Sequence, residues 1–294
     1  MVKTSIGAWA YIWGGYAEDP IPLEKVVKKL SELNFDGIEF AAFEPHMKEN
    51  TKEERKRIKK LFDDHGLEIS GGVGGYPSPA TSSMDEYMDA VKTNLEMCVD
   101  MGIPKLRVDS IDPPTEVPGG LDYETAFKNV AEKWNKTAEL CAKDNVHVVW
   151  EFEPGFIFNK PSEVVRMVYM VDHPNFTTMF DTCHAHMCGV VGARQMGEKE
   201  TLPGGVVQFA HMLTGKIGHF HLIDSDNTLH DDDTSTHAPI GTGVLDFDSI
   251  IEAVKEAGYN DQWWTVDLCF WPNALEVTED NKKALDKLIQ KHGY

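Results

Sequence analysis

The sequence predicts an α/β protein with the (β/α)8 TIM-barrel fold, built as a single domain over residues 1–294. Short β-rich runs alternate along the chain with longer segments that carry apolar residues at helical spacing. This alternation is typical of parallel strands joined by crossover helices. The length of 294 residues, 41% of them hydrophobic, suits one barrel, because such folds commonly span about 250 residues. No stretch of low complexity suggests a linker between domains.

Eight strand–helix pairs can be assigned in chain order. The expected strands are residues 4–13, 37–40, 68–73, 105–109, 147–152, 177–180, 217–222 and 263–268. The clearest helices are expected at residues 23–33, 87–101, 127–141 and 250–257, where apolar side chains recur on one face. Because alternate strand residues point to opposite faces, such a strand can present polar groups on one side and pack against helices on the other.

Several loops that follow the expected strands are rich in proline and glycine, at residues 71–79, 113–120 and 203–205. Loops at the carboxyl ends of the strands build the active sites of barrels of this kind. A longer polar segment, residues 223–243, contains five aspartates and two histidines. We expect this segment to be either a substrate lid or a solvated insertion.

The charge balance argues against nucleic-acid and membrane partners. The chain has 28 Lys+Arg against 48 Asp+Glu, a formal net charge of -20, and would repel phosphates and anionic headgroups. Its five scattered cysteines lack the spacing of a disulfide framework or a zinc site. No apolar run approaches the ~20 residues of a membrane span, and the N-terminus lacks the apolar core of a signal peptide. We therefore expect a cytoplasmic protein.

Acidic and imidazole side chains collect at four of the expected strand ends. They are Glu151 and Glu153, Asp181 with His184 and His186, His219 and His221, and Asp267. Burying several carboxylates together is costly unless a cation, a shared proton or mutual pairing compensates them. One divalent metal ion satisfies all of these groups at once, and an internal ion-pair network is the alternative.

The composition of this set favours certain ions. An oxygen-rich site without thiolates suits Mn²⁺, Co²⁺ or Mg²⁺ better than a closed structural zinc site, with zinc as an alternative. We expect His184 to contact metal or substrate more directly than His186. Of His219 and His221, which share a strand face, we expect one to be a ligand and the other a hydrogen-bonded neighbour.

Aromatic residues gather at the first and last expected strands. Trp9, Tyr11 and Trp13 alternate, so they should share one strand face, and Trp263, Trp264, Phe270 and Trp271 crowd the last strand. Flat rings suit the C–H faces of sugars or a larger aromatic group, and packing inside the barrel is the alternative. The expected substrate contacts are Trp13, Glu39, Arg107, Glu153, His186, His219 and Trp271. For Arg107 the alternative is an ion-pair network with Asp109.

Several longer runs occur in a definite order: Glu-Phe-Glu-Pro-Gly from residue 151, Phe-Asp-Thr-Cys-His from 180, Gly-His-Phe-His from 218 and Pro-Ile-Gly-Thr-Gly from 239. In order and spacing they resemble the xylose isomerase-like TIM-barrel superfamily of sugar isomerases and epimerases, and in particular the tagatose-type ketose epimerases. The resemblance extends over nearly the whole chain. As a set, the motifs are specific for the superfamily and say little about the substrate.

The resemblance implies a metal site formed by Glu151, Asp181, His221 and Asp267, with His184 in contact with the substrate. Asp267 stands where the epimerases have a glutamate, and Asn227 stands near the place of an epimerase arginine. The shorter carboxylate would shift the proton-transferring oxygen, and catalysis is sensitive to displacements on the order of 1 Å. This difference weighs against an epimerisation in which two carboxylates exchange the proton.

Site and resemblance together predict a divalent-metal-dependent sugar isomerase or epimerase acting on a small carbohydrate. It would move a proton next to a metal-bound carbonyl, with Glu151 as the base and Asp267 or His184 as its partner. The first alternative is a lyase, dehydratase or C-glycoside-cleaving enzyme acting on a 3-keto sugar, and the second is a non-catalytic metal- or sugar-binding barrel. Since relatives often form dimers or tetramers, a homo-oligomer is also expected.

Overall fold

The computed structural model describes residues 2–293 and contains an eight-stranded parallel sheet closed into a barrel. Its strands are β1 (Lys3–Ile6), β2 (Gly37–Ala41), β3 (Glu68–Val73), β4 (Lys105–Val108), β5 (His147–Glu151), β6 (Phe176–Asp181), β7 (Ile217–Leu222) and β10 (Trp263–Val266). They lie in the order β1, β10, β7, β6, β5, β4, β3, β2, and a parallel bridge between Gly7 and Glu39 joins the two ends of this order. The predicted single-domain (β/α)8 barrel is confirmed.

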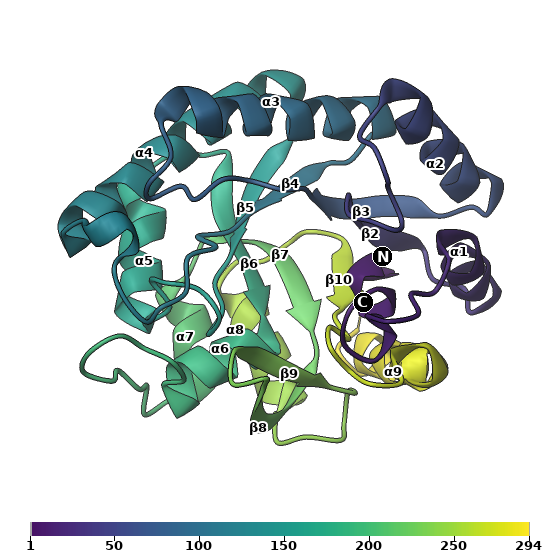
Figure 1. Ribbon diagram of the computed structural model, residues 1–294. Coiled ribbons are helices and arrows are strands. Elements are labelled where there is room, and N and C mark those ends of the chain that lie inside the picture. The colour runs from purple at the N-terminus through teal and green to yellow at the C-terminus, as the bar shows by residue number, and fades with distance from the viewer. Residues whose placement is uncertain (1, 294) are drawn as a thin grey trace.

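Helices surround the strands on their outer side (Figure 1). They are α1 (Leu23–Glu32), α2 (Lys52–Asp64), α3 (Met84–Met101), α4 (Tyr123–Cys141), α5 (Pro161–Val171), α6 (Thr182–His186), α7 (Gly205–Met212), α8 (Phe247–Glu256) and α9 (Ala274–Lys291). Within residues 2–293, no helix combines the length and the apolar composition needed to cross a lipid bilayer.

Capping residues set the helix starts that apolar periodicity alone placed too late. Helix α3 begins at Met84 because the Ser83 hydroxyl accepts the N–H of Glu86, and α4 begins at Tyr123 because Asp122 accepts the N–H of Thr125. Gly102 ends α3 in the left-handed conformation, with φ 69°. The buried faces of these helices cover the barrel with large rings, such as Trp134 of α4, whose centroid lies 4.9 Å from that of Trp150 of β5.

The prediction of one long first strand over residues 4–13 is wrong. Strand β1 ends at Ile6, and the chain then forms the short 3-10 helices η1 (Ala8–Tyr11) and η2 (Gly14–Tyr16). Trp9, Tyr11 and Trp13 therefore do not share a strand face. Tyr11 turns away toward α9, where its hydroxyl lies 2.9 Å from the hydroxyl of Thr278, whereas Trp9 and Trp13 border the pocket described below.

The polar segment 223–243 folds as an antiparallel hairpin of β8 (Asp224–His230) and β9 (Thr234–Ala238) rather than an irregular loop. Figure 1 shows this hairpin beside the strand ends, next to α6. The buried Asp224 carboxylate fixes its base by accepting the backbone N–H groups of Gly241, Gly243 and Leu245. The hairpin is thus an ordered wall of the barrel opening, with β9 largely buried and the tip exposed.

Candidate metal centre and substrate pocket

Four side chains from four strand ends converge in the barrel opening, each at most 1% exposed. Glu151 ends β5, Asp181 ends β6, His221 lies near the end of β7, and Asp267 directly follows β10. His221 Nδ1 lies 3.1 Å from Glu151 Oε1, 3.6 Å from Asp267 Oδ2 and 3.8 Å from Asp181 Oδ2. One donor atom from each of the four lies within 4.8 Å of the others.

The donor set fits a divalent cation. His221 Nδ1, Asp181 Oδ2 and Glu151 Oε1 are buried and have no hydrogen-bond partner among the described residues. Unpartnered polar atoms in a protein interior are costly, and these face one another. Burial and the neighbouring carboxylates, partly offset by His237, raise the pKa of Asp181 to about 7, which reflects an excess of negative charge. A bound cation would satisfy all three atoms.

A second set of buried groups lies beneath this cluster, deeper in the barrel. Glu39 Oε2 is 2.9 Å from His221 Nε2 and 2.8 Å from His219 Nε2, and His219 Nδ1 is 3.0 Å from Lys105 Nζ. Burial alone would lower the pKa of His221, but the carboxylates of Glu39, Asp267 and Glu151 outweigh burial and raise the pKa. In the neutral form with Nε2–H toward Glu39, Nδ1 would direct a lone pair at the three carboxylates. Burial and Lys105 lower the pKa of His219 to about 4.

Glu39 and His219 were expected to contact substrate, but they do not line the pocket. Both are 0% exposed, and they lie within hydrogen-bond distance of each other beneath the donor cluster. The strand alternation that pairs His219 with His221 is observed, yet the two differ in depth along β7. His221 stands level with the end of β6, opposite Asp181, whereas His219 stands opposite Met179.

Asp267 is tightly held by its surroundings. Its Oδ1 accepts the indole N–H of Trp9 at 2.8 Å and the backbone N–H of Cys269 at 2.8 Å. Its Oδ2 faces His221 Nδ1. Although burial opposes ionisation, His237 and His221 outweigh it and hold the pKa of Asp267 well below its usual range. One oxygen of Asp267 is thus committed to structure, and the other remains available to a cation.

The wall formed by α6 and the hairpin carries a second polar group around His184. His184 donates its backbone N–H to Asp181 Oδ1 at 2.7 Å, which caps α6, and its Nδ1 lies 2.9 Å from Ser235 Oγ. Its Nε2 lies 3.3 Å from Glu153 Oε2, which also accepts the hydroxyl of Thr234. Burial, reinforced by nearby carboxylates, raises the pKa of Glu153 to about 8.

Arg107 of β4 forms an ion pair with Glu151 of β5. Its Nε donates to Asp109 Oδ1 at 2.9 Å, and its Nη1 forms an ion pair with Glu151 Oε2. The guanidinium also lies over the Trp9 ring, 5.7 Å from the centroid. The sequence left Arg107 open between substrate contact and an ion-pair network with Asp109. The structure contains that ion pair, and Arg107 also lines the pocket.

His237 is a site residue that the sequence analysis did not single out. It lies on β9 with Nδ1 3.3 Å from Asp267 Oδ1 and Nε2 3.8 Å from Asp181 Oδ1, and its ring is 4.7 Å from that of His184. Burial alone would lower its pKa, but Asp267 and Asp181 outweigh burial and raise the pKa to about 9. The only sequence signal was its membership of the acidic, histidine-containing segment 223–243. Pairing of β8 with β9 is what turns it inward.

The donor cluster opens into a cavity of about 440 Å³. Of the expected site residues, the cavity is lined by Trp13, Arg107, Glu151, Glu153, His184 and Asp267. Its remaining lining is largely aromatic or apolar and includes Trp9, Phe43, Val73, Tyr76, Ile111, Phe156 and Phe270. It combines a charged inner end with a ring-lined outer end, which is the usual composition of a small-molecule site.

Two expected substrate contacts, His186 and Trp271, lie outside this cavity. His186 Nε2 is 2.6 Å from the side-chain oxygen of Asn227 on the outer part of the hairpin, because a position two residues further along α6 faces away from His184. Trp271 borders a separate depression of about 280 Å³ together with Pro239 and Asn281. The chain reverses after Phe270, which has φ 63°, and this reversal takes Trp271 out of the barrel opening.

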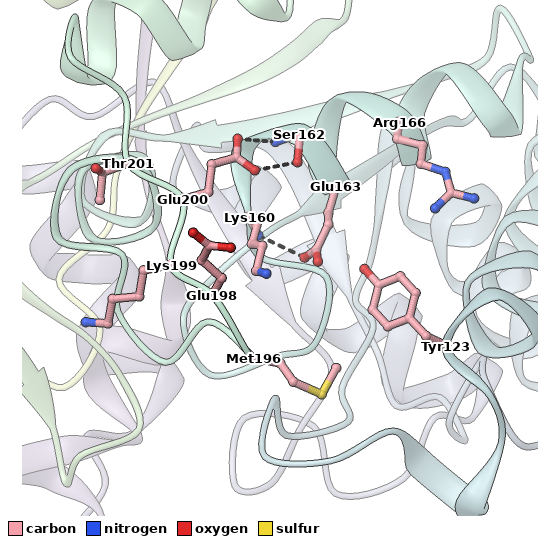
Figure 2. Close-up of a pocket in the computed structure, with 10 residues that line it drawn as sticks. All are labelled: Tyr123, Lys160, Ser162, Glu163, Arg166, Met196, Glu198, Lys199, Glu200 and Thr201. Carbon is pink, nitrogen blue, oxygen red and sulfur yellow. Dashed lines mark hydrogen bonds between the residues drawn. The ribbon is translucent and has the colours of Figure 1, made fainter.

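Another depression, of about 960 Å³, lies between the start of α5 and residues 196–201 (Figure 2). Two of its carboxylates pair with groups at the start of α5. Glu200 accepts the backbone N–H of Ser162 at the start of α5, and Glu163 accepts the backbone N–H of Lys160. The helix N-terminus is thus already capped by carboxylates of the chain itself.

Comparisons with known proteins agree with this geometry. The fructoselysine 3-epimerase of Escherichia coli O157:H7 is 24% identical over 270 residues, covering 84% of this chain and 86% of that protein. The inosose dehydratase of Geobacillus thermodenitrificans is 22% identical over 287 residues, covering 86% of each chain. The crystal structure of IOLI protein with a binding zinc atom superposes with a TM-score of 0.71 at 16% identity, covering 97% of this chain and 96% of that one.

A family model also matches most of the chain. The model described as xylose isomerase-like TIM barrel matches residues 27–293, which include every member of the donor cluster. This match agrees with the barrel topology and with the superfamily indicated by the sequence motifs. The chain belongs to the xylose isomerase-like TIM barrel family.

Proposed function

We propose that the protein is a divalent-metal-dependent sugar isomerase or epimerase. The observation that supports this most strongly is the convergence of Glu151, Asp181, His221 and Asp267 around buried atoms that lack hydrogen-bond partners. When bound there, a divalent ion such as Mn²⁺, Co²⁺, Mg²⁺ or Zn²⁺ would polarise the carbonyl of a keto sugar and so acidify the adjacent carbon. The ketose 3-epimerase among the relatives supports this class of reaction.

The chain itself provides the groups that would move the proton. Glu151 borders the cavity and is our first choice as the base, with its Oε2 oriented by Arg107. Both partners considered, His184 and Asp267, border the cavity. His184 is the better placed, because Asp267 Oδ1 already accepts hydrogen bonds from Trp9 and Cys269 and its Oδ2 would bind the ion. Glu153, Arg107 and Trp13 would position the substrate, because all three border the same cavity.

An elimination from a 3-keto sugar is the second candidate, favoured by the state of Asp267. A two-carboxylate epimerisation needs a second carboxylate with a free oxygen on the opposite face of the reacting carbon. Asp267 Oδ1 already accepts two hydrogen bonds, from Trp9 and Cys269, and Oδ2 would bind the ion. One base combined with an acid such as Glu153 would suffice for elimination, and the inosose dehydratase among the relatives fits this reaction.

The first experiment measures the metal content of the purified protein by plasma mass spectrometry. Wild type is compared with Glu151→Gln and Asp181→Asn, with Glu68→Gln at an exposed carboxylate as the matched control. We expect about one divalent ion per chain in wild type and in the control, and little in the two site variants. A wild type that stays metal-free after incubation with these ions would overturn the proposal and favour an internal ion-pair network.

The second experiment measures proton exchange in deuterium oxide with free ketohexoses and 3-keto glucosides. Deuterium entering the carbon next to the ketone, with interconversion of isomers, supports the isomerase or epimerase. Exchange followed by an unsaturated product identifies the elimination. A metal-loaded protein that binds these sugars without exchanging any proton would be a non-catalytic binding barrel.

A further inference from the structure

A row of aromatic rings borders the outer end of the cavity. The Trp13 centroid lies 5.8 Å from that of Phe43 and 6.1 Å from that of Phe270, and Trp13 and Phe270 are nearly parallel at 17°. His230 from the hairpin continues the row, stacked on Phe270 at 4.4 Å and 12°. We call Phe43, Trp13 and Phe270, all of which line the cavity, the aromatic shelf.

The aromatic shelf differs in character from the inner end of the cavity. Its three rings are half-buried, so part of each is accessible, whereas the side chains of the donor cluster are fully buried. The rings come from three separate loops, which follow β1, β2 and β10. With each centroid about 6 Å from the next, the shelf extends beyond the width of a single sugar ring. Flat ring faces arranged in this way suit a flat, apolar group.

The backbone around Phe270 is shaped to hold this ring in place. Phe270 has φ 63°, a conformation that bulky residues rarely adopt and that persists only where the surroundings enforce it. Gly14 enforces it by close packing, since a Cβ added there would lie 2.5 Å from Phe270 Cα. A Cβ added at Gly15 would likewise lie 2.1 Å from the carbonyl oxygen of Pro272. Strain of this kind is characteristic of ligand-binding segments.

The charges around the cavity favour a neutral ligand. Arg107 is the one lysine or arginine among its described lining residues, and Asp109 and Glu151 already pair with it. The imidazole of His237 also lines the cavity, but it lies 3.3 Å from Asp267 Oδ1 and 3.8 Å from Asp181 Oδ1. Among the described lining residues, each cationic side chain therefore already has a carboxylate beside it, which leaves none for a phosphate or carboxylate on the substrate. The volume of about 440 Å³ lies within the range of roughly 300–1,000 Å³ that holds drug-sized ligands, so a group can be attached to the sugar.

We propose that the aromatic shelf is a subsite for a neutral aromatic group attached to the sugar, so that the ligand is an aryl glycoside of a keto sugar, such as an aryl 3-keto glucoside, rather than a free ketose. The location of the sugar next to the donor cluster rests on the proposed function, whereas the ring-binding role of the shelf rests on its own geometry. Stacking would hold the aromatic group at the outer end and leave the sugar carbonyl toward Glu151 and His184.

The test measures binding by isothermal titration calorimetry to the protein as purified and after loading with Mn²⁺. The probes are phenyl β-D-glucopyranoside, methyl β-D-glucopyranoside and cellobiose, which place a phenyl ring, a methyl group or a second sugar at the shelf. We expect the phenyl glycoside to bind about ten-fold more tightly than the other two, as stacking on aromatic faces allows.

Two variants remove single rings, and a third serves as the control. Phe270→Gly keeps the left-handed backbone, which glycine adopts readily, so its effect reports the ring and not the loop. In Phe270→Gly and Trp13→Leu the preference for the phenyl glycoside should fall to about two-fold or less. Tyr169→Leu removes an exposed ring on α5, outside the cavity lining, and should leave the preference unchanged.

The outcomes separate this inference from the proposed function. Equal binding of phenyl glycoside and cellobiose, or a phenyl preference that survives in both shelf variants, overturns the aromatic subsite whatever the metal content. A phenyl preference that depends on the shelf, in a protein that stays metal-free after incubation with Mn²⁺ and the other ions, supports the subsite and overturns the proposed function. Metal binding and proton exchange without a phenyl preference leave the proposed function standing and overturn the subsite.

Discussion

Glu39 lies directly behind His221, a member of the donor cluster. Its Oε2 lies within hydrogen-bond distance of both His219 and His221, and it is completely buried. Burial alone would raise its pKa, but the two imidazoles outweigh burial and hold the pKa well below the usual range, so Glu39 stays ionised. A carboxylate behind a ligating imidazole fixes the tautomer and increases the basicity of the free nitrogen.

We therefore expect Glu39→Gln to weaken metal binding by about 10–100-fold while the barrel remains folded. The amide keeps the size of the side chain but loses the charge that orients His221. Metal titration by calorimetry measures the change, with circular dichroism as the check on folding. Glu68→Gln, at an exposed carboxylate, should bind as wild type does. Unchanged affinity in Glu39→Gln would show that the imidazole is oriented by packing alone.

Asp267 is one of the two positions, with Asn227, at which this chain differs from the tagatose-type epimerase pattern. Glutamate there would be longer by one methylene in a fully buried setting, and its oxygen would be displaced from Trp9 Nε1 and the N–H of Cys269. If the proposed function is right, Asp267→Glu should retain the ion, because a carboxylate remains. It should lose stability by about 1–3 kcal/mol through overpacking and lost hydrogen bonds.

Metal content and the thermal midpoint, measured together, test this prediction. Trp9→Phe is the matched control, since it removes the same hydrogen bond without lengthening the carboxylate. Complete loss of metal in Asp267→Glu would count against Asp267 as a ligand that glutamate can replace. A gain in epimerase activity would instead indicate that the geometry of the two-carboxylate reaction is accessible to this barrel.

At the scale of elements, the loops after β1 and β10 fit together through glycines. Gly14 has φ 60°, and a Cβ there would meet the Phe270 backbone, whereas Gly66 has φ 70° with no atom within 4 Å of an added Cβ. Both Gly→Ala substitutions incur the cost of left-handed backbone, about 1–2 kcal/mol. Gly14→Ala should lower stability by a further 1–3 kcal/mol or so, because backbone would have to move.

The difference between the melting temperatures of the two alanine variants measures the steric cost at Gly14, because both variants share the cost of the left-handed backbone. We also expect Gly14→Ala, unlike Gly66→Ala, to weaken binding of phenyl β-D-glucopyranoside, because the displaced backbone carries the Phe270 ring. Equal melting temperatures for the two variants would contradict the close packing of these loops.

The hairpin β8–β9 is the element that completes the pocket wall. It contributes His237 beside Asp267 and Asp181, Ser235 beside His184, and Thr234 beside Glu153. Arg194 pairs with Asp233 near its tip, which ties the hairpin to the segment after α6. This insertion between two barrel strands thereby contacts the carboxylates of the donor cluster through His237 and the carboxylate of Glu153 through Thr234.

For the whole molecule, a divalent cation can stabilise the fold either at the acidic surface or in the buried donor cluster. A formal net charge of -20 attracts divalent ions over the entire surface, whereas the donor cluster offers one buried site. At a hundred-fold excess over Kd, an ion bound only to the folded state stabilises it by about 2.7 kcal/mol. Mn²⁺ should therefore raise the thermal midpoint of wild type well above the effect of NaCl at equal ionic strength.

The double variant Glu151→Gln/Asp181→Asn separates the two sources of stabilisation. We expect it to show only the small rise caused by screening, and chelation to reverse the larger rise in wild type. An equal response to Mn²⁺ in both proteins would place the stabilising ions on the acidic surface and not in the barrel.

Local patterns in the sequence were sufficient to predict the fold and the strand ends that build the site. Strand alternation and helical periodicity are properties of neighbouring positions, so the placement of Glu151, Asp181, His221 and Asp267 at strand ends could be anticipated. Only the tertiary structure decided which polar residues meet. Strand register and loop geometry determine how deep His219 lies in β7 and that His237 faces inward. They also turn Trp9 toward Asp267 and place His186 and Trp271 outside the cavity. These bring together residues far apart in the chain, where periodicity carries no information.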